Sequence, residues 1–408
     1  MTKGPWARGG TGARLAAFAA LVSLCTASTG AAQTGLTGAP QLARVYDAIL
    51  DARFDQVGPL LTQTCGPRES PGAVAPSTGG LAPAEACQLL ELVSLWWQIQ
   101  IDPRNPAHDD EFRMRADASI AAVEAWTRRE PMRAEAWFYL GGAYGARAQW
   151  RVLREERLAA ARDGKRIKRA LEQALDLDPE LQDAYFGIGL YHYYAAVAPM
   201  AARMLRWLLW LPGGDRAGGL KEMLRARGSG QLLHSEADYQ LHLISLWYEK
   251  QPDRALQLLR GLRDRHPRNP HFLQLIAEVE DVYLHDVQTS LRSWQLLLEA
   301  AQSRRVAEPL MAEATARLGV ARQLDRRSET EAAIPHLRAV IAMKPTAPYG
   351  VIARAHVQLG QALDHLGRRS EALTEYRAAL ASLPPGDPEK IEARARAGLR
   401  APHTRSKT

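Results

Sequence analysis

The chain has 408 residues, of which 46% are hydrophobic and 24% are charged, and its formal net charge is +7. Most of the excess positive charge lies at the two ends, because the residues before 15 and those after 385 each contribute three charges. The body between them is close to neutral, so we predict no nucleic-acid partner. The length suits two or three ordinary domains or one long array of repeats.

The first 32 residues have the pattern of a secretory signal peptide. Three basic residues come first, a mostly apolar run follows at 15–24, and small residues end the segment at Ala32. We therefore expect cleavage near Ala32 and a periplasmic or secreted mature chain that begins near Gln33. Two alternatives are an uncleaved anchor and a buried helix, although an apolar run of ten residues is short for a bilayer core of about 30 Å. A third alternative is lipidation of Cys25.

Residues 33–66 are predicted to form a short capping helix pair, and a Gly-, Pro- and Ser-rich loop follows at 67–83. Cys65 and Cys87 flank this loop. In an oxidising compartment we expect these two cysteines to form a disulfide that closes the loop, worth roughly 3 kcal/mol. No further cysteine or histidine stands beside them at the spacing of metal ligands, so we predict no metal site.

A pattern of helix pairs runs from residue 84 to residue 385. Its clearest motif is Trp137-x-x-Leu140-Gly141-x-x-Tyr144, whose members share one face of a helix. A second helix follows and ends before a proline, which disfavours helical geometry in the residue that precedes it. The motif and its recurrence about every 34 residues resemble the tetratricopeptide repeat.

This resemblance implies an all-α fold, a right-handed solenoid of antiparallel helix pairs, with two insertions in the central repeats here. We expect eight pairs. After the cap, residues 84–302 form an array with long central helices, and residues 303–385 form C-terminal pairs, of which 353–384 fits the motif best. Residues 386–408 are expected to be a basic disordered tail.

The first insertion lengthens the central pair, which starts at Ala134 and closes at Pro179. The excess over a standard repeat is about 14 residues, or about two extra turns on each helix. We expect these turns to protrude as an overhang that is solvated or packs on a neighbouring insertion. The overhang carries Arg147, Trp150, Arg151 and Arg154.

The second insertion, residues 197–211, has Met and Leu on one helical stripe and Trp beside Arg on the other. It is too short to span a membrane. Two interpretations stay open: an inserted helix in the core, or a helix at a membrane surface with Trp and Arg at the depth of the headgroups.

The resemblance also implies a concave wall, built by the first helix of each pair, that binds a protein or peptide ligand. The aromatic candidates are equally consistent with anchors for apolar peptide side chains and with core packing against the inserted helix. The partner-binding candidates are Phe138, Phe186, Tyr193, Tyr194, Gln240, Trp247 and Tyr248. The same repeat positions in the last pair give a more polar set, Arg354, Gln361, Asp364 and His365.

The sequence has no motif of a phosphate-binding loop, a zinc protease or a serine hydrolase. We therefore predict no catalytic residue, no cofactor and no metal. His192 stands in an aromatic run, where a histidine is more often a hydrogen-bonded structural residue than a catalytic base. The glycine-rich turn at 211–216 is expected to end with Asp215 as the cap of the next helix.

These observations predict a non-catalytic periplasmic scaffold that binds a protein or peptide partner, in cell-envelope assembly or organisation. The alternative is a peripheral membrane protein that uses residues 197–211.

Overall fold

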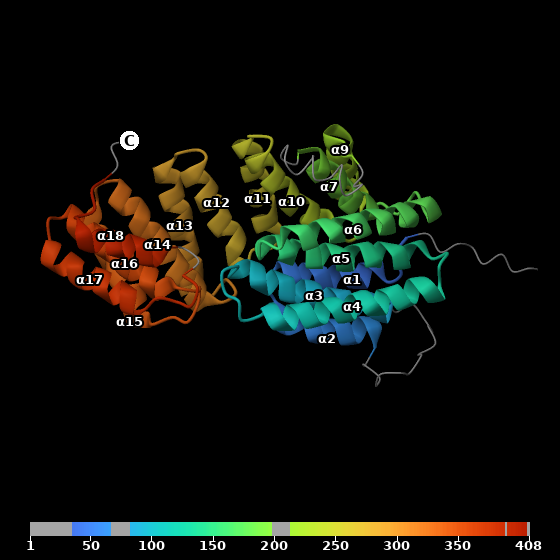
Figure 1. Ribbon diagram of the computed structural model, residues 1–408, viewed down its shortest axis with the longest axis horizontal. Coiled ribbons are helices and arrows are strands. Elements are labelled where there is room, and N and C mark those ends of the chain that lie inside the picture. The colour runs from blue at the N-terminus through green and yellow to red at the C-terminus, as the bar shows by residue number, and fades with distance from the viewer. Residues whose placement is uncertain (1–34, 67–81, 198–212, 388–389, 406–408) are drawn as a thin grey trace, which may run out of the picture. The chain divides into compact units, whose positions relative to one another are not determined.

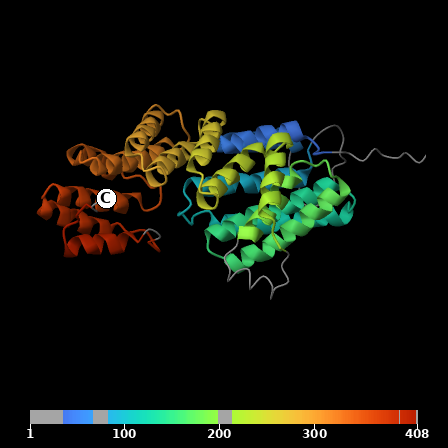
Figure 2. The same cartoon turned by 90° about the horizontal axis from the view of Figure 1, so that it is seen from above.

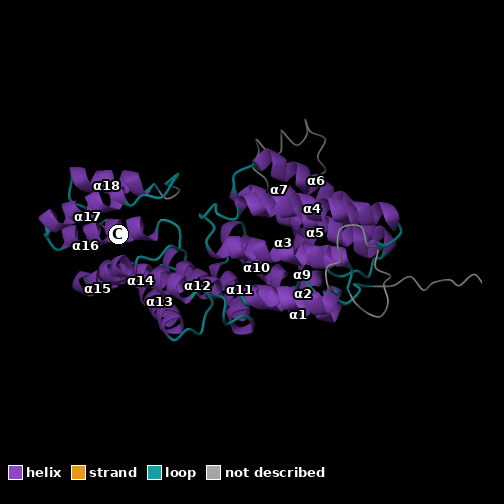
Figure 3. Cartoon of the chain, turned by 90° about the horizontal axis from the view of Figure 1, so that it is seen from below, coloured by secondary structure: helices purple, strands orange, loops and turns teal. Residues whose placement is uncertain are grey.

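The computed structural model describes residues 35–66, 82–197, 213–387 and 390–405 (Figure 1). These ranges contain seventeen helices and no strand (Figure 3). Three predicted segments fall wholly or almost wholly outside them: the signal peptide, the loop at 67–83 and the inserted helix at 197–211. The all-α solenoid of helix pairs that the sequence predicts is confirmed.

Sixteen of the described helices form eight consecutive pairs, the number expected from the repeat pattern. The pairs are α1 (Ala39–Leu50) with α2 (Phe54–Cys65), α3 (Ala84–Ile101) with α4 (Asp109–Arg129), α5 (Ala134–Leu153) with α6 (Arg157–Leu177), α7 (Ala184–Val197) with α9 (Arg216–Ser229), α10 (His234–Trp247) with α11 (Pro252–Arg265), α12 (Pro270–Val282) with α13 (Val287–Gln302), α14 (Pro309–Arg326) with α15 (Thr330–Met343), and α16 (Val351–His365) with α17 (Arg369–Ala381). A further helix, α18 (Ile391–Arg400), follows them.

Close packing within a pair depends on small residues at the motif positions. A Cβ atom on Gly141 of α5 would lie 2.6 Å from Leu171 of α6, and one on Gly360 of α16 would lie 2.7 Å from Tyr376 of α17. Larger side chains would force the helices of each pair apart. The predicted cap of α9 is also present, since the Asp215 carboxylate accepts a hydrogen bond from the Gly218 amide at 3.0 Å.

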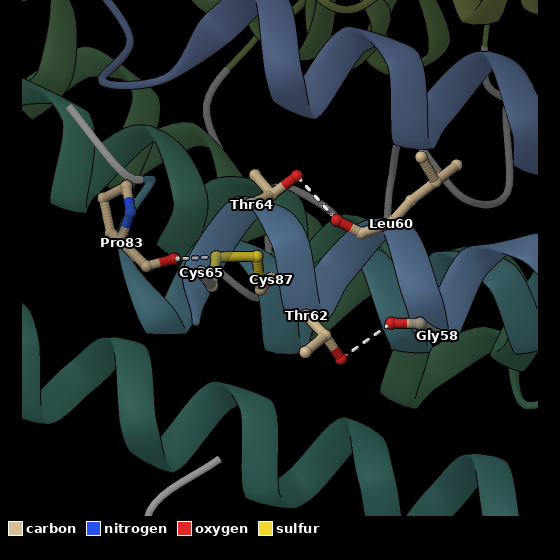
Figure 4. The surroundings of a disulfide bond; sticks show 7 residues. All are labelled: Gly58, Leu60, Thr62, Thr64, Cys65, Pro83 and Cys87. Atoms are coloured by element: carbon tan, nitrogen blue, oxygen red, sulfur yellow. Dashed lines mark hydrogen bonds between the residues drawn. A yellow bond between two sulfur atoms is a disulfide. The ribbon is translucent and has the colours of Figure 1, made fainter. Parts of the chain in front are cut away.

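A disulfide joins the capping pair to the array (Figure 4). It links Cys65, the last residue of α2, to Cys87 in the first turn of α3, with the two Cα atoms 6.5 Å apart. Beside it the amide of Ala82 donates to the carbonyl of Thr64 at 3.1 Å. The end of α2 and the start of α3 are therefore held together by a covalent bond and a backbone hydrogen bond.

The central pair is long, as predicted, but the expected overhang does not protrude. Trp150 is buried, stacks on Phe112 of α4 with the ring centroids 5.7 Å apart, and donates to Asp109 at 3.0 Å. Arg154 makes two hydrogen bonds of 2.8 Å to the same Asp109 carboxylate. The prediction was wrong because α4, with 21 residues, is long as well and covers the added turns.

The other two arginines of the predicted overhang bind a buried acid. Arg147 and Arg151 both bind the carboxylate of Asp163 on α6, at distances of 2.6 to 3.0 Å. Asp163 is fully buried, so this shared carboxylate fixes α5 to α6 inside the protein.

The basic tail is a second correction, because residues 391–400 form α18. Ile391 and Ala395 are buried, and with Gly398 they make an apolar stripe that packs on α16 and α17. Arg369 of α17 donates to the carbonyl of Gly398 at 2.7 Å, which satisfies an end of the helix. In the sequence this segment is rich in charged residues, so a helical stripe of only three small or apolar positions is hard to recognise.

Two hydrophobic cores meet on α12. The first runs from Leu36 to Val279 and the second from Ala277 to Tyr376. We refer to helices α1 to α11 as the N-terminal half and to helices α12 to α18 as the C-terminal half; Figure 2 colours the first from blue to yellow and the second from orange to red.

Candidate functional site

In the N-terminal half, first helices that are far apart in the sequence touch one another. Trp97 of α3 is fully buried, with its ring 4.9 Å from Tyr239 of α10 and 5.9 Å from Phe272 of α12. The hydroxyl of Tyr46 on α1 donates to Glu236 of α10 at 2.9 Å. The interior of this half is thus filled by its own helices.

The chain before and after α1 is bound in the same way. Glu135 at the start of α5 accepts two hydrogen bonds from Thr37, at 2.7 Å from its amide and 2.9 Å from its hydroxyl. Beyond α1, the amide group of Asn269 donates to the carbonyl of Leu50 at 2.8 Å. Glu135 and Asn269 thus bind residues at the two ends of α1.

Four of the predicted partner-binding residues are therefore in the interior. Phe138 belongs to the first core, and Phe186 and Tyr193 pack in a cluster with α9 and α10. Gln240 is buried and donates to Gln149 of α5 at 3.0 Å. Burial takes these four side chains out of reach of a partner, which corrects that part of the prediction.

The other three predicted residues lie nearer the surface. The ring of Tyr248 is 5.6 Å from that of Tyr194 and 5.9 Å from that of Tyr193. Trp247 is 51% exposed beside them. Tyr193 donates its hydroxyl to Glu249, which Arg216 also binds at 2.9 Å. This aromatic group is anchored on one side and open on the other.

Two histidines are buried where α10 and α12 meet α3. Burial lowers the pKa of His242 to about 3 and that of His271 to about 4, so both rings are neutral at pH 7. His192, by contrast, is half-buried and contacts Glu222 at 2.8 Å, a hydrogen-bonded position of the expected kind. The rings of His242 and His271 both pack against Tyr239 and are buried, so neither is exposed to solvent.

The C-terminal half has an open cavity between its first helices. Its volume is about 270 Å³. Most of the lining comes from α12, α14 and α16, with one residue from the turn between α3 and α4 and one from α18. The charged and amide side chains of the lining are Arg104, Gln274, Glu278, Arg322, Asp325, Arg354, Gln358, Gln361 and Arg394.

Two of the four residues predicted from the repeat positions of the last pair line this cavity. Arg354 and Gln361 line it, as the resemblance implies. Asp364 instead pairs with Arg369 at 2.9 Å, and His365 pairs with Asp325 at 2.9 Å. Sequence reasoning missed Arg104, which comes from a turn of the other half and carries no motif.

Basic side chains outnumber acidic ones in the lining of the cavity, and the two acidic side chains already accept hydrogen bonds. Burial alone raises the pKa of Asp325, but hydrogen bonds from His365, Thr330 and Arg405 outweigh it and lower that pKa. Glu278 accepts a hydrogen bond from Gln274 at 3.0 Å. Four arginines thus stand against two carboxylates that already have hydrogen-bond donors.

Within the described residues, no cluster of three or more His, Cys, Asp or Glu side chains has a geometry that could hold a metal ion. Among the helices that the structure describes, none has both the length and the apolar character needed to cross a membrane.

Residues 321–388 match the family model of the tetratricopeptide repeat. This segment is a tetratricopeptide-repeat region. The matched segment runs from α14 through α17 and includes the pair that fits the motif best in the sequence. No curated protein matches the sequence.

Solved structures of helical-repeat proteins are similar over most of the chain. A Rap protein in complex with competence and sporulation factor is 14% identical, with a TM-score of 0.43 over 88% of this chain and 77% of that one. Yeast Tom70 is 13% identical, with a TM-score of 0.40 over 88% and 81%. A human IFIT1 dimer with m7Gppp-AAAA is 12% identical, with a TM-score of 0.42 over 85% and 69%.

Proposed function

We propose that this protein is a non-catalytic scaffold whose C-terminal half binds a segment of a partner protein. The observation that carries the proposal is the cavity of about 270 Å³ between α12, α14 and α16. In the N-terminal half the space between the first helices is filled by packed side chains, and the cavity of about 310 Å³ found there lies between α2, α3 and α4 instead.

We further propose that the protein works in the periplasm, in the assembly or organisation of the cell envelope. Two features support this location: the signal-like pattern of the first 32 residues and the Cys65–Cys87 disulfide, a bond that persists in oxidising compartments. N-terminal sequencing of the chain released by osmotic shock should give a start near Gln33. Recovery of an uncleaved chain from the cytosol would contradict this location.

A photo-crosslinking amino acid at Gln361, which lines the cavity, tests the binding function in cells. We expect a discrete crosslinked partner. A matched control carries the same amino acid at Met132, an exposed residue of the N-terminal half. The proposal fails if Gln361 captures nothing, or only what Met132 captures. A third probe at Trp247 tests the exposed part of the predicted binding set.

A further inference from the structure

We infer that residues 401–405, which follow α18, occupy one end of the cavity of the C-terminal half, and that a partner binds there only by displacing them. We call these residues the C-terminal strap. The inference rests on the proposed function and adds the regulation of its site. It depends on where the strap lies, how it is bound and how exposed it is.

The strap crosses from the last helix pair to the pair before it. The backbone amide of His403 donates at 2.8 Å to the carboxylate of Asp364, which lies one residue before the end of α16. Two residues later, the guanidinium of Arg405 donates to the hydroxyl of Ser328 at 3.1 Å and to that of Thr330. Ser328 and Thr330 belong to the turn between α14 and α15 and to the start of α15. The strap therefore passes over the C-terminal ends of α16 and α14.

The strap and the cavity share a residue. Asp325 lines the cavity, and its carboxylate lies 3.4 Å from the guanidinium of Arg405. His365 binds the same carboxylate through Nδ1 at 2.9 Å, and its ring lies 5.2 Å from the ring of His403. Asp364 and His365 stand at the repeat positions from which a partner-binding wall was predicted. The strap thus lies against this wall, at one end of the cavity.

A partner segment in the cavity would reach the strap within about one helical turn. Gln361 lines the cavity and lies three and four residues before Asp364 and His365, so the three side chains share one face of α16. The cavity, at about 270 Å³, is slightly smaller than the roughly 300–1,000 Å³ of ordinary ligand sites. A segment of several residues advances about 3.3 Å per residue when extended and therefore continues along the wall. It would meet the contacts that the strap now makes.

The strap is bound in a way that permits exchange. All five of its residues are exposed, and the side chain of Arg405 is 40% exposed. Ion pairs at such positions contribute little to stability, so the contacts can be replaced by those of a partner. The short connection to α18 nevertheless keeps the strap at an effective concentration on the order of millimolar, which excludes weak competitors. A tethered, weakly bound and exposed segment has the properties of an internal competitor.

The full-length variant Arg405→Glu tests the displacement, because it places a second carboxylate beside Asp325 and should release the strap. The probe is the free pentapeptide Ala-Pro-His-Thr-Arg, which copies residues 401–405, followed by saturation-transfer NMR at millimolar concentration. We expect the peptide signal to be at least about threefold stronger with Arg405→Glu than with the natural protein, whose own strap competes. The peptide Ala-Pro-His-Thr-Glu should give no signal. Equal signals from the two proteins, or no signal with Arg405→Glu, would overturn the inference.

The control Arg377→Glu makes the same change of charge at an exposed residue of α17 and should behave like the natural protein. Hydrogen exchange separates release of the strap from damage to the fold. The amide of His403 should exchange faster in Arg405→Glu only, with the amides of α14 to α17 unchanged. A rise spread over α14 to α17 would show that the strap is a structural part of the fold and would refute the inference.

Crosslinking in cells from Gln361 connects the strap to the partner. The yield of the crosslinked partner should be at least about threefold higher in Arg405→Glu than in the natural protein, and unchanged in Arg377→Glu. If the natural protein and Arg405→Glu capture the same partner in equal yield, the proposed function holds and the inference is rejected. If Gln361 captures nothing even in Arg405→Glu, the proposed function fails and the inference fails with it.

Discussion

The N-terminal and C-terminal halves are built from the same helix pair, yet their first helices meet different surroundings. In the N-terminal half, Trp97 and Tyr46 extend across the interior to α10, so the residues there are packed or hydrogen-bonded to the chain itself. In the C-terminal half, Arg354 and Gln361 occupy matching repeat positions and line a cavity. A residue at a given repeat position can therefore pack in the core or line a cavity, depending on which residues lie opposite to it.

The polar residues show this difference most clearly. Glu236 is enclosed between α1 and α10, and burial raises its pKa even though Tyr46 and Gln240 hydrogen-bond to it. The side-chain oxygen of Gln358 has no hydrogen-bond partner in the part of the chain that the structure describes. A buried acceptor left without a donor costs about 1–3 kcal/mol.

The largest expected effect tests whether the N-terminal interior is filled. Trp97→Ala should lower the free energy of unfolding by about 4 kcal/mol, because it removes a fully buried ring between Tyr239 and Phe272. Trp247→Ala, at an exposed position, should cost no more than about 0.5 kcal/mol. Urea denaturation followed by circular dichroism measures both. Equal losses would mean that Trp97 is no more enclosed than an exposed side chain and that this interior is not filled as described.

The next effect concerns the covalent link in the N-terminal half. Cys65→Ser/Cys87→Ser should cost about 3 kcal/mol, since the bridge spans a sequence separation of 22 residues and restricts the unfolded chain. Hydrogen exchange should rise in α1 to α3 and stay unchanged in α14 to α17. Dithiothreitol should reproduce the loss in the natural protein and have no effect on the double variant. A uniform rise in exchange would show that the halves unfold as one unit.

A smaller effect is confined to the C-terminal half. Gly398→Ala should cost about 2 kcal/mol, because a Cβ atom there would overlap the ring of Tyr376 and push α18 from its site. The control Gly228→Ala, in α9 with open space around it, should cost nothing and gain up to about 1 kcal/mol of helix stability. Thermal unfolding measures both.

The smallest effect depends on pH. His242 stands where other repeats have Leu, and neither of its ring nitrogens has a hydrogen-bond partner among the described residues. His242→Leu should therefore raise the free energy of unfolding at pH 7.5 by about 1 kcal/mol.

The sign of the pH effect follows from the lowered pKa of His242, which is about 3 in the folded state and near 6.5 in the unfolded chain. The unfolded chain binds the proton first, so His242 lowers the stability of the natural protein below about pH 6.5, by up to about 1.4 kcal/mol per pH unit, and has no such effect above it. The advantage of His242→Leu should grow from pH 7.5 to 5.5. Trp247→Ala should show no such growth, and a constant advantage for His242→Leu would mean that His242 is accessible to protons.

Much of the fold could be predicted from the sequence because local spacing specifies it. The Trp-x-x-Leu-Gly-x-x-Tyr motif located the central pair, and the helices of the described ranges form the pairs that the sequence predicts. The errors concern contacts between separate pairs. Trp150 was placed on an exposed overhang because the sequence does not reveal that α4 covers it, and α18 was overlooked because three apolar or small positions are a weak signal.

The candidate site was predictable only in part for the same reason. The repeat positions identified Arg354 and Gln361, yet they also selected Phe138 and Tyr193, which are core residues. Nothing in the local pattern around Arg104 indicates that its turn meets the start of α16, 247 residues further along the chain from Asp102.

The sequence by itself determined the helices, their pairing and their order, because apolar spacing and helix-ending residues act over a few turns. Only the tertiary structure decided which first helices pack against each other and which leave a cavity. That choice depends on contacts between pairs far apart in the chain: Trp97 fills the space between first helices in one half, whereas the described residues of the other half leave a cavity there.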